Sequence, residues 1–264
     1  MASIGSYNPG RFSVLRRLLV FGLLSASSPA VAAADVDLEL VLAADISDSM
    51  DQDEQRLQRS GYARAFRDAE IIDAITAGPR GRIAVTFVEW GDLAQARVVV
   101  PWHMIDGSGT AKAFAEKLER SRIGRMGRTS ISGALSFGAH LIENNDYRGD
   151  RRVIDVSGDG PNNQGRPVDA ARDAVVARGI VINGLPILIK LNDPRDPFGS
   201  GFDKRVLDIY YRDCVIGGPS AFMVPIRSRA ELAEGIRYKL LLEIAGREPR
   251  PVPAAWPASR HLSC

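Results

Sequence analysis

The sequence contains few of the residues on which several classes of protein depend. Its 264 residues include two cysteines and three histidines, His103, His140 and His261, which are far apart in the chain. Imidazoles this far apart in sequence argue against a histidine-rich zinc site. After the N-terminal region no segment approaches the roughly 18 uncharged apolar residues of a membrane-spanning helix. We therefore expect no membrane span in the mature chain.

An excess of charge of one sign is also missing. The formal net charge is +2, and residues 1–34 carry three arginines and no acidic residue, so the rest of the chain has a net charge of 2 − 3, or −1. A nearly neutral body lacks the basic surface that binding to a phosphate backbone requires. We therefore predict that the protein does not bind nucleic acid.

The N-terminal region, residues 1–34, has the layout of a secretory signal peptide. Arginines precede a short apolar run, Leu18–Leu24, and small residues follow up to Ala34. An Ala-x-Ala pattern places cleavage before Asp35, and the apolar run is short for a membrane span, although an uncleaved anchor is the alternative. The expected location is therefore outside the cytoplasm, either periplasmic or secreted.

From residue 36 onward, apolar strand-like runs alternate with helical patterns. Runs rich in Val and Ile are typical of strands buried on both faces. Strands that alternate with helices indicate a parallel sheet covered by helices on both sides. We predict a single α/β domain over residues 36–246 and a Pro-rich tail over 247–264. The predicted strands are 38–44, 82–90, 94–101, 152–156, 180–189 and 221–226.

Two helix predictions are specific about where a helix begins and ends. Residues 53–75 have one continuous helical pattern. The last helix is predicted to begin with a capping box formed by Ser228 and Glu231, and to end at Gly246.

Oxygen-bearing side chains gather where predicted strands end. Asp45, Ser47 and Ser49 follow the first strand, Thr129 lies where a loop meets a helix, and Asp159 follows the fourth strand. In an open α/β sheet, ligands bind beyond the carboxyl ends of the strands. Carboxylate and hydroxyl oxygens suit Mg²⁺, Mn²⁺ or Ca²⁺ better than zinc. The pattern therefore predicts a divalent-metal site.

This set of residues resembles the metal-ion-dependent adhesion site of von Willebrand factor type A domains. Asp45, Ser47 and Ser49 match the family's DxSxS motif, and Thr129 and Asp159 match its distant threonine and aspartate. The resemblance covers roughly residues 36–246 and is greatest to exported bacterial members with no assigned role. It implies a Rossmann-like, open, mostly parallel six-stranded sheet with helices on both faces.

The resemblance also implies a function. Ser47, Ser49 and Thr129 would coordinate the ion directly, and Asp45 and Asp159 would bind it directly or through water. Two carboxylates neutralise a divalent ion, Mg²⁺ above all, but leave one position open, which the acidic side chain of a protein partner can fill. The implied protein is an adhesion-type interaction module.

The chain departs from the family pattern at two positions, neither of which removes a ligand. Asp48 stands where glycine is common, and Gly158 where threonine is common. Asp48, Glu89 and Asp92 are interpreted either as residues that support the ligands or as solvated loop charges.

Signatures of catalysis are not found in the sequence. It contains no phosphate-binding loop of the G-x-x-x-x-G-K type and no nucleophile elbow of the G-x-S-x-G type. A phosphatase with an aspartyl nucleophile would need a second aspartate where Ser47 stands. We therefore expect no enzymatic activity. The alternatives are a scaffold domain that binds its partners independently of the metal, and a metal-dependent hydrolase.

Three further features leave alternatives open. Cys214 and Cys264 would form a disulfide in an exported protein, or else stay as free or intermolecular thiols. Asp155 lies within a predicted strand, where it would pair with Arg151 or Arg152 or mark the point at which the sheet reaches the surface. The segment 191–208 should lie on the metal-bearing side, where it either shapes partner choice or is a plain surface loop.

Overall fold

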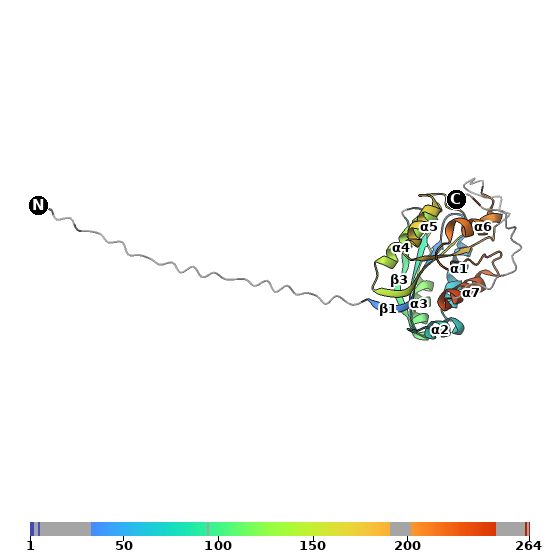
Figure 1. Cartoon of the computed structure of the whole chain (residues 1–264), viewed down its shortest axis with the longest axis horizontal. Coiled ribbons are helices and arrows are strands. Elements are labelled where there is room, and N and C mark those ends of the chain that lie inside the picture. The colour runs from blue at the N-terminus through green and yellow to red at the C-terminus, as the bar shows by residue number, and fades with distance from the viewer. Residues whose placement is uncertain (3–4, 6–32, 94, 191–201, 247–261, 263) are drawn as a thin grey trace. The chain divides into compact units, whose positions relative to one another are not determined.

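A computed structural model describes residues 1–2, 5, 33–93, 95–190, 202–246, 262 and 264 (Figure 1). The chain divides into two units, residues 1–31 and 32–264, and the account below concerns the second. The predicted signal peptide and Pro-rich tail lie almost entirely outside the described residues. Within the described ranges, no helix is long and apolar enough to cross a membrane.

The centre of the domain is a five-stranded sheet with the order β3-β2-β1-β4-β5. β1, β2, β4 and β5 are parallel, and the edge strand β3 runs antiparallel to β2. The central strand β1 is buried from Val36 onward, which explains its nearly continuous apolar run. The strands are β1 (Ala34–Asp45), β2 (Ile83–Trp90), β3 (Arg97–Ile105), β4 (Tyr147–Gly158) and β5 (Val181–Pro186).

The prediction of six strands is wrong by one. Residues 221–226 lie beside β5 but make only isolated parallel bridges to it. Four backbone hydrogen bonds join the two segments, and Pro186, which has no amide hydrogen, interrupts the ladder between the bonds donated by Gly184 and Leu188.

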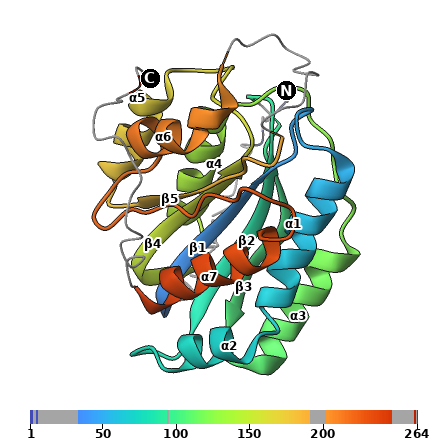
Figure 2. The same cartoon turned by 90° about the vertical axis from the view of Figure 1, so that its right-hand side faces the viewer.

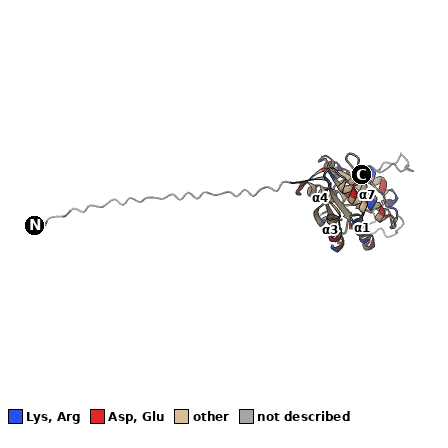
Figure 3. Ribbon diagram, turned by 90° about the horizontal axis from the view of Figure 1, so that it is seen from below, with Lys and Arg blue, Asp and Glu red and all other residues tan. Residues whose placement is uncertain are grey.

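Helices cover both faces of the sheet (Figure 2). Leu38, Leu40 and Leu42 of β1 pack on α1, α2, α3 and α7, whereas Val41 and Ala43 face α4, α5 and α6. Lys and Arg are mixed with Asp and Glu over the helices rather than gathered by sign (Figure 3). The helices are α1 (Gln52–Ala65), α2 (Ala69–Thr76), α3 (Ser108–Arg120), α4 (Ile131–Glu143), α5 (Val168–Val176), α6 (Leu207–Tyr210) and α7 (Leu232–Ala245), with a 3₁₀ helix η1 (Lys204–Val206) and a π-helix η2 (Tyr211–Val215).

Two helix predictions need correction. Residues 53–75 form two helices, because the Asp68 side chain accepts the backbone N–H groups of Glu70 and Ile71 and caps a new helix there. The capping box at Ser228 is not formed: α7 begins at Leu232, and the Glu231 carboxylate accepts the N–H of Arg227 instead. The predicted end at Gly246 is confirmed, with φ of 61° in the left-handed region.

Asp155 lies in the core, with neither of its predicted partners. Its carboxylate is 2.6 Å from the ammonium of Lys239 on α7, and each side chain is only 1% exposed. The Tyr62 hydroxyl donates a hydrogen bond to the same carboxylate. Arg151 and Arg152 instead donate to backbone carbonyls. The buried charge of Asp155 in β4 is therefore compensated by Lys239 of α7, which lies far along the chain.

The register of the sheet places the ends of three strands at one edge. Asp45 is opposite Trp90 of β2, and Ala44 is opposite Ser157 of β4. Asp159, two residues beyond Ser157, therefore emerges beside the loop that follows β1.

Candidate metal centre

Asp45 ends β1 and turns the chain that follows. Its Oδ1 accepts the backbone N–H of Ser47 at 2.7 Å. The side chain is fully buried, and among the described residues Oδ2 has no hydrogen-bond partner. Burial, and then the negative charge of Asp159, raises the pKa of Asp45 to about 7 against the opposing hydrogen bonds from Ser47. A buried carboxylate oxygen without a partner is costly unless a ligand such as a cation satisfies it.

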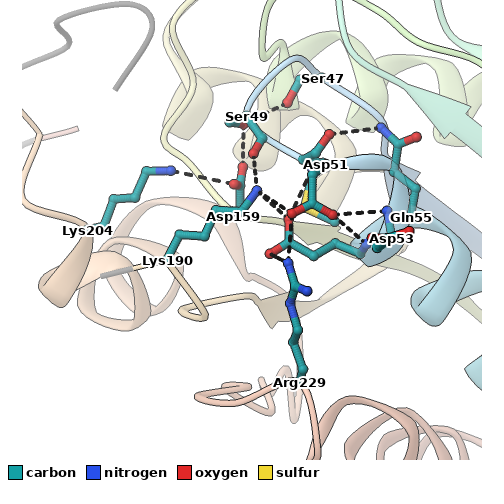
Figure 4. A network of polar contacts seen from close by, with 11 residues as sticks. Ser47, Ser49, Asp51, Asp53, Gln55, Asp159, Lys190, Lys204 and Arg229 are labelled. Atoms are coloured by element: carbon teal, nitrogen blue, oxygen red, sulfur yellow. Dashed lines mark hydrogen bonds and ion pairs between the residues drawn. The ribbon is translucent and has the colours of Figure 1, made fainter. Parts of the chain in front are cut away.

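The two serines connect the turn after Asp45 to Asp159, and Figure 4 shows the contacts of Ser47, Ser49 and Asp159. The hydroxyl oxygens of Ser47 and Ser49 are 3.1 Å apart. The Ser49 hydroxyl donates a short hydrogen bond to Asp159 Oδ1. Hydrogen bonds therefore join four of the five predicted ligands at the carboxyl edge of the sheet, with the backbone N–H of Ser47 as the contact to Asp45.

The loop that carries Thr129, the fifth predicted ligand, is hydrogen-bonded to the loop after β1. The N–H of Met126 donates to Ile46 O at 3.0 Å, which fixes this loop to the one after β1. Thr129 is buried, and its own N–H donates to the Asn163 side chain at 3.0 Å. In the part of the chain that the structure describes, its hydroxyl makes no hydrogen bond to the other four residues.

The donor set fits a hard divalent ion. The residues brought together offer two carboxylates and the hydroxyls of serine and threonine, all of which are oxygen donors. No cluster of three or more His, Cys, Asp or Glu side chains able to hold a metal is found within the described ranges. An ion at this edge would therefore depend on the hydroxyls as well as on the carboxylates.

The three residues interpreted as supporting the ligands have different roles. Asp92 accepts the N–H groups of Gly127 and Arg128, each at 3.1 Å, and so shapes the loop that carries Thr129. Glu89 is buried rather than solvated and pairs with two arginines. Asp48 pairs with Arg125 at 2.8 Å.

Comparison with family models gives a match over most of the chain. The family described as "Protein of unknown function (DUF1194)" matches residues 35–248. The chain belongs to this family. Comparison with curated protein sequences finds no match.

Solved structures with the same fold are von Willebrand factor type A domains and adhesive proteins. The von Willebrand factor domain of the type V pili tip protein Mfa5 from Porphyromonas gingivalis is 10% identical, with a TM-score of 0.52 over 84% of this chain and 99% of that one. Proximal thread matrix protein 1 from the mussel byssus, with a zinc-occupied MIDAS motif, is 18% identical, with a TM-score of 0.53 over 81% and 49%. The pilus adhesin SpaC from Lactobacillus rhamnosus GG is 12% identical, with a TM-score of 0.56 over 79% and 30%.

These likenesses establish the fold of the DUF1194 chain, which is that of a von Willebrand factor type A domain. The chain spans about half or less of the length of the first structures that it matches.

The glycine that departs from the family pattern is explained by a tyrosine. A Cβ atom at Gly158 would lie 2.9 Å from Asp45 Oδ2 and 2.9 Å from the Tyr211 hydroxyl oxygen. Threonine therefore does not fit in the DUF1194 chain, because Tyr211 of the π-helix η2 fills that space. π-helical turns are frequent at functional sites. Glycine in place of the family's threonine at position 158 was the sequence signal that another side chain, that of Tyr211, occupies this space.

Two lysines at the site were not foreseen. Lys190 Nζ lies 2.5 Å from Glu54 Oε2, and Lys204 Nζ lies 3.5 Å from Asp159 Oδ2 (Figure 4). Single lysines in loops have no periodicity, so nothing in the sequence marked them. The part of segment 191–208 that includes residues 191–201 lies outside the described residues.

Proposed function

We propose that the protein is an exported module that binds a divalent metal ion and, through it, an acidic group of a protein partner. The observation that carries this proposal is that hydrogen bonds join Asp45, Ser47, Ser49 and Asp159 at the carboxyl edge of the sheet, where one buried carboxylate oxygen has no hydrogen-bond partner among the described residues. Thr129 is the fifth proposed ligand.

The chain's own residues prepare this site for an ion. Asp45 fixes the turn by accepting the Ser47 N–H, and the hydrogen bond between Ser49 and Asp159 joins the loops after β1 and β4. Asp92 holds the loop of Thr129 in place. When bound, Mg²⁺ would supply an open coordination position for a carboxylate from the partner.

The solved structures support an adhesive role outside the cytoplasm. SpaC is a pilus adhesin, Mfa5 is a pilus tip protein, and the mussel protein has a zinc-occupied MIDAS motif. An exported, periplasmic or secreted location agrees with these proteins. Zinc in the mussel protein supports a divalent ion, and the oxygen donors of this chain favour Mg²⁺, with Mn²⁺ or Ca²⁺ as substitutes.

A non-enzymatic role is the better proposal, because neither of the two histidines among the described residues contacts the proposed ligands. His103 is engaged with Lys117, and His140 with Asn144. The Ser49 hydroxyl is bonded to Asp159 rather than to a general base of the kind that activates a serine nucleophile.

Titration calorimetry with Mg²⁺ and Mn²⁺ tests the proposed metal site. We expect the chain to bind one ion, Asp159→Ala to abolish binding, and Asp48→Asn, which alters a carboxylate paired with Arg125, to leave it unchanged. The folded chain failing to take up either ion would overturn the proposal. Partner capture that persists in chelator would favour the metal-independent scaffold instead.

A further inference from the structure

Two ammonium groups reach the proposed metal site, and the structure holds them differently. Lys190 Nζ contacts Glu54 Oε2 at 2.5 Å, Ser49 O at 2.8 Å and Asp51 Oδ2 at 3.4 Å. These three partners match the three donors of an ammonium group, so the charge of Lys190 is already committed. Its role is to tie the loop after β1 to the start of α1.

Lys204 is held loosely by comparison. Within the described ranges, its one polar partner is Asp159 Oδ2 at 3.5 Å, which is at the outer limit for a hydrogen bond. Its side chain is 24% exposed, so it lies at the rim of the site. The backbone at its base is fixed, because Lys204 begins the 3₁₀ helix η1, which the Asp203 side chain caps. The ammonium can therefore move while the residue stays beside the site.

Lys204 contacts the carboxylate that a metal ion would share. Asp159 binds Ser49 through Oδ1 and Lys204 through Oδ2. Without an ion, the ammonium offsets one of two neighbouring negative charges, those of Asp45 and Asp159. With a divalent ion present, those two carboxylates are neutralised, and the ammonium becomes a surplus positive charge at the rim.

We propose that Lys204 competes with the metal ion for Asp159 and, once displaced, becomes a second contact for the partner's carboxylate. This inference rests on the function proposed above. It makes Lys204 a specificity-determining residue: a carboxylate gains both the ion and the ammonium, whereas a neutral amide or hydroxyl of similar shape gains only the ion. The partner chemistry that fits is an acidic side chain, Asp or Glu, presented at a protein surface.

Removing the Lys204 ammonium should raise the affinity for the metal ion and lower the affinity for the partner's carboxylate. One unit-charge interaction at about 4 Å in solvent corresponds to roughly a fivefold change in affinity. In Lys204→Met we therefore expect Mn²⁺ to bind about fivefold tighter, and a carboxylate to bind the Mn²⁺-loaded protein about fivefold more weakly. Lys204→Arg should stay near the wild type, because the charge is retained.

The experiment uses two probes and one matched control. Calorimetry measures Mn²⁺ alone, and water-proton relaxation of the Mn²⁺-loaded chain measures N-acetylglutamate N-methylamide, with the glutamine analogue as the neutral probe. The control is Lys112→Met, which removes an exposed lysine from α3. It should change neither affinity, whereas the glutamine analogue should bind wild type and Lys204→Met equally.

Each outcome decides a different claim. Opposite changes in Lys204→Met, absent in Lys112→Met, support the inference. Unchanged affinities in Lys204→Met overturn the inference and leave the metal site standing. A fall in both affinities also overturns it, because Lys204 would then only hold the site in shape. If wild type binds no Mn²⁺, the proposed function fails, and the inference fails with it.

Discussion

At the scale of single residues, Gly158 leaves no room for a side chain beside Asp45. A side chain there would press on Asp45 Oδ2 and on the Tyr211 hydroxyl at once. We predict that Gly158→Thr lowers Mn²⁺ affinity at least tenfold and destabilises the fold by about 1–3 kcal/mol. Calorimetry and urea denaturation would measure the two effects.

Two comparison variants make this prediction specific. Gly160→Ala should be neutral, since nothing lies within 4 Å of a Cβ at that position. Removing the hydroxyl in the double variant Gly158→Thr/Tyr211→Phe should recover part of the lost affinity. Equal losses in Gly158→Thr and Gly160→Ala would contradict the close approach as the cause.

Another residue-scale feature is a buried group of two carboxylates and one ammonium. Lys239 lies between Asp155 and Glu243, and all three are almost completely buried. Burial, followed by the charge of Asp155, raises the pKa of Glu243 to about 7, while Lys239 and Asn183 oppose the shift. The single ammonium of Lys239 can neutralise only one of the two carboxylates. Glu243, whose pKa is raised, therefore retains its proton below about pH 7.

This group predicts a stability that depends on pH. The folded chain keeps a proton on Glu243 that the unfolded chain releases near pH 4.5, so stability falls as the pH rises from about 4.5 to 7 and then levels off. Glu243→Gln should remove a difference on the order of 2 kcal/mol from that window. Asp45, with its own raised pKa, leaves a smaller slope in both chains.

Urea denaturation in chelator between pH 5 and 8 measures this slope. Glu234→Gln, on the same helix, is the matched control, because Glu234 is exposed and its hydrogen bond from Arg237 lowers its pKa, which places its titration below this window. It should keep the slope of the wild type. Parallel profiles for wild type and Glu243→Gln would rule out the buried proton.

At the scale of elements, one ion pair joins α1 to β2 and to the segment before Thr129. Arg59 of α1 pairs with Glu89 of β2 in the interior and also donates to the carbonyls of Ser121 and Arg122. Arg59→Met should destabilise the fold by about 3 kcal/mol, because it leaves Glu89 buried with only part of its pairing.

The same helix supplies the control for this pair. Arg56 and Asp53 form an exposed pair, with side chains 61% and 76% accessible. Arg56→Met should therefore change the unfolding free energy by less than about 0.5 kcal/mol. Similar losses for the two variants would show that the buried pair is not what holds these elements together.

The accuracy of sequence-based prediction differs between elements for physical reasons. β1 was predicted well, because burial on both faces demands a continuous apolar run. Residues 221–226 are also mostly apolar, but Pro186 interrupts their hydrogen-bond ladder with β5. The break before α2 is caused by Asp68, which caps a new helix within a continuous helical pattern. Hydrophobic periodicity alone cannot predict such a break.

At the scale of the whole domain, a disulfide ties the end of the chain to the core. Cys214 of η2 is bonded to Cys264, and 50 residues separate them in sequence. Closing so long a loop restricts the unfolded chain, so a reductant should lower the unfolding free energy by about 2–4 kcal/mol. Denaturation with and without dithiothreitol measures this, and a Cys214→Ser/Cys264→Ser variant should not respond to the reductant.

The candidate site shows which contacts between residues distant in sequence could be predicted. Asp45, Ser47 and Ser49 are contiguous with a strand, so pattern and resemblance predicted that they act together. Lys204 and Tyr211 reach the site only through tertiary folding, and neither lies in a recognisable motif. The pairing of Asp155 with Lys239 was likewise beyond prediction, because two buried charges give no periodic signal that connects them.

The central claim is that Asp45, Ser47, Ser49, Thr129 and Asp159 surround one divalent ion. Anomalous diffraction from crystals of the chain grown with Mn²⁺ tests it most directly. The account predicts one strong anomalous peak within coordination distance of Ser47, Ser49 and Asp159, and its loss in chelator. A folded chain whose Mn²⁺ peak lies elsewhere, or which shows no peak at saturating Mn²⁺, would contradict it.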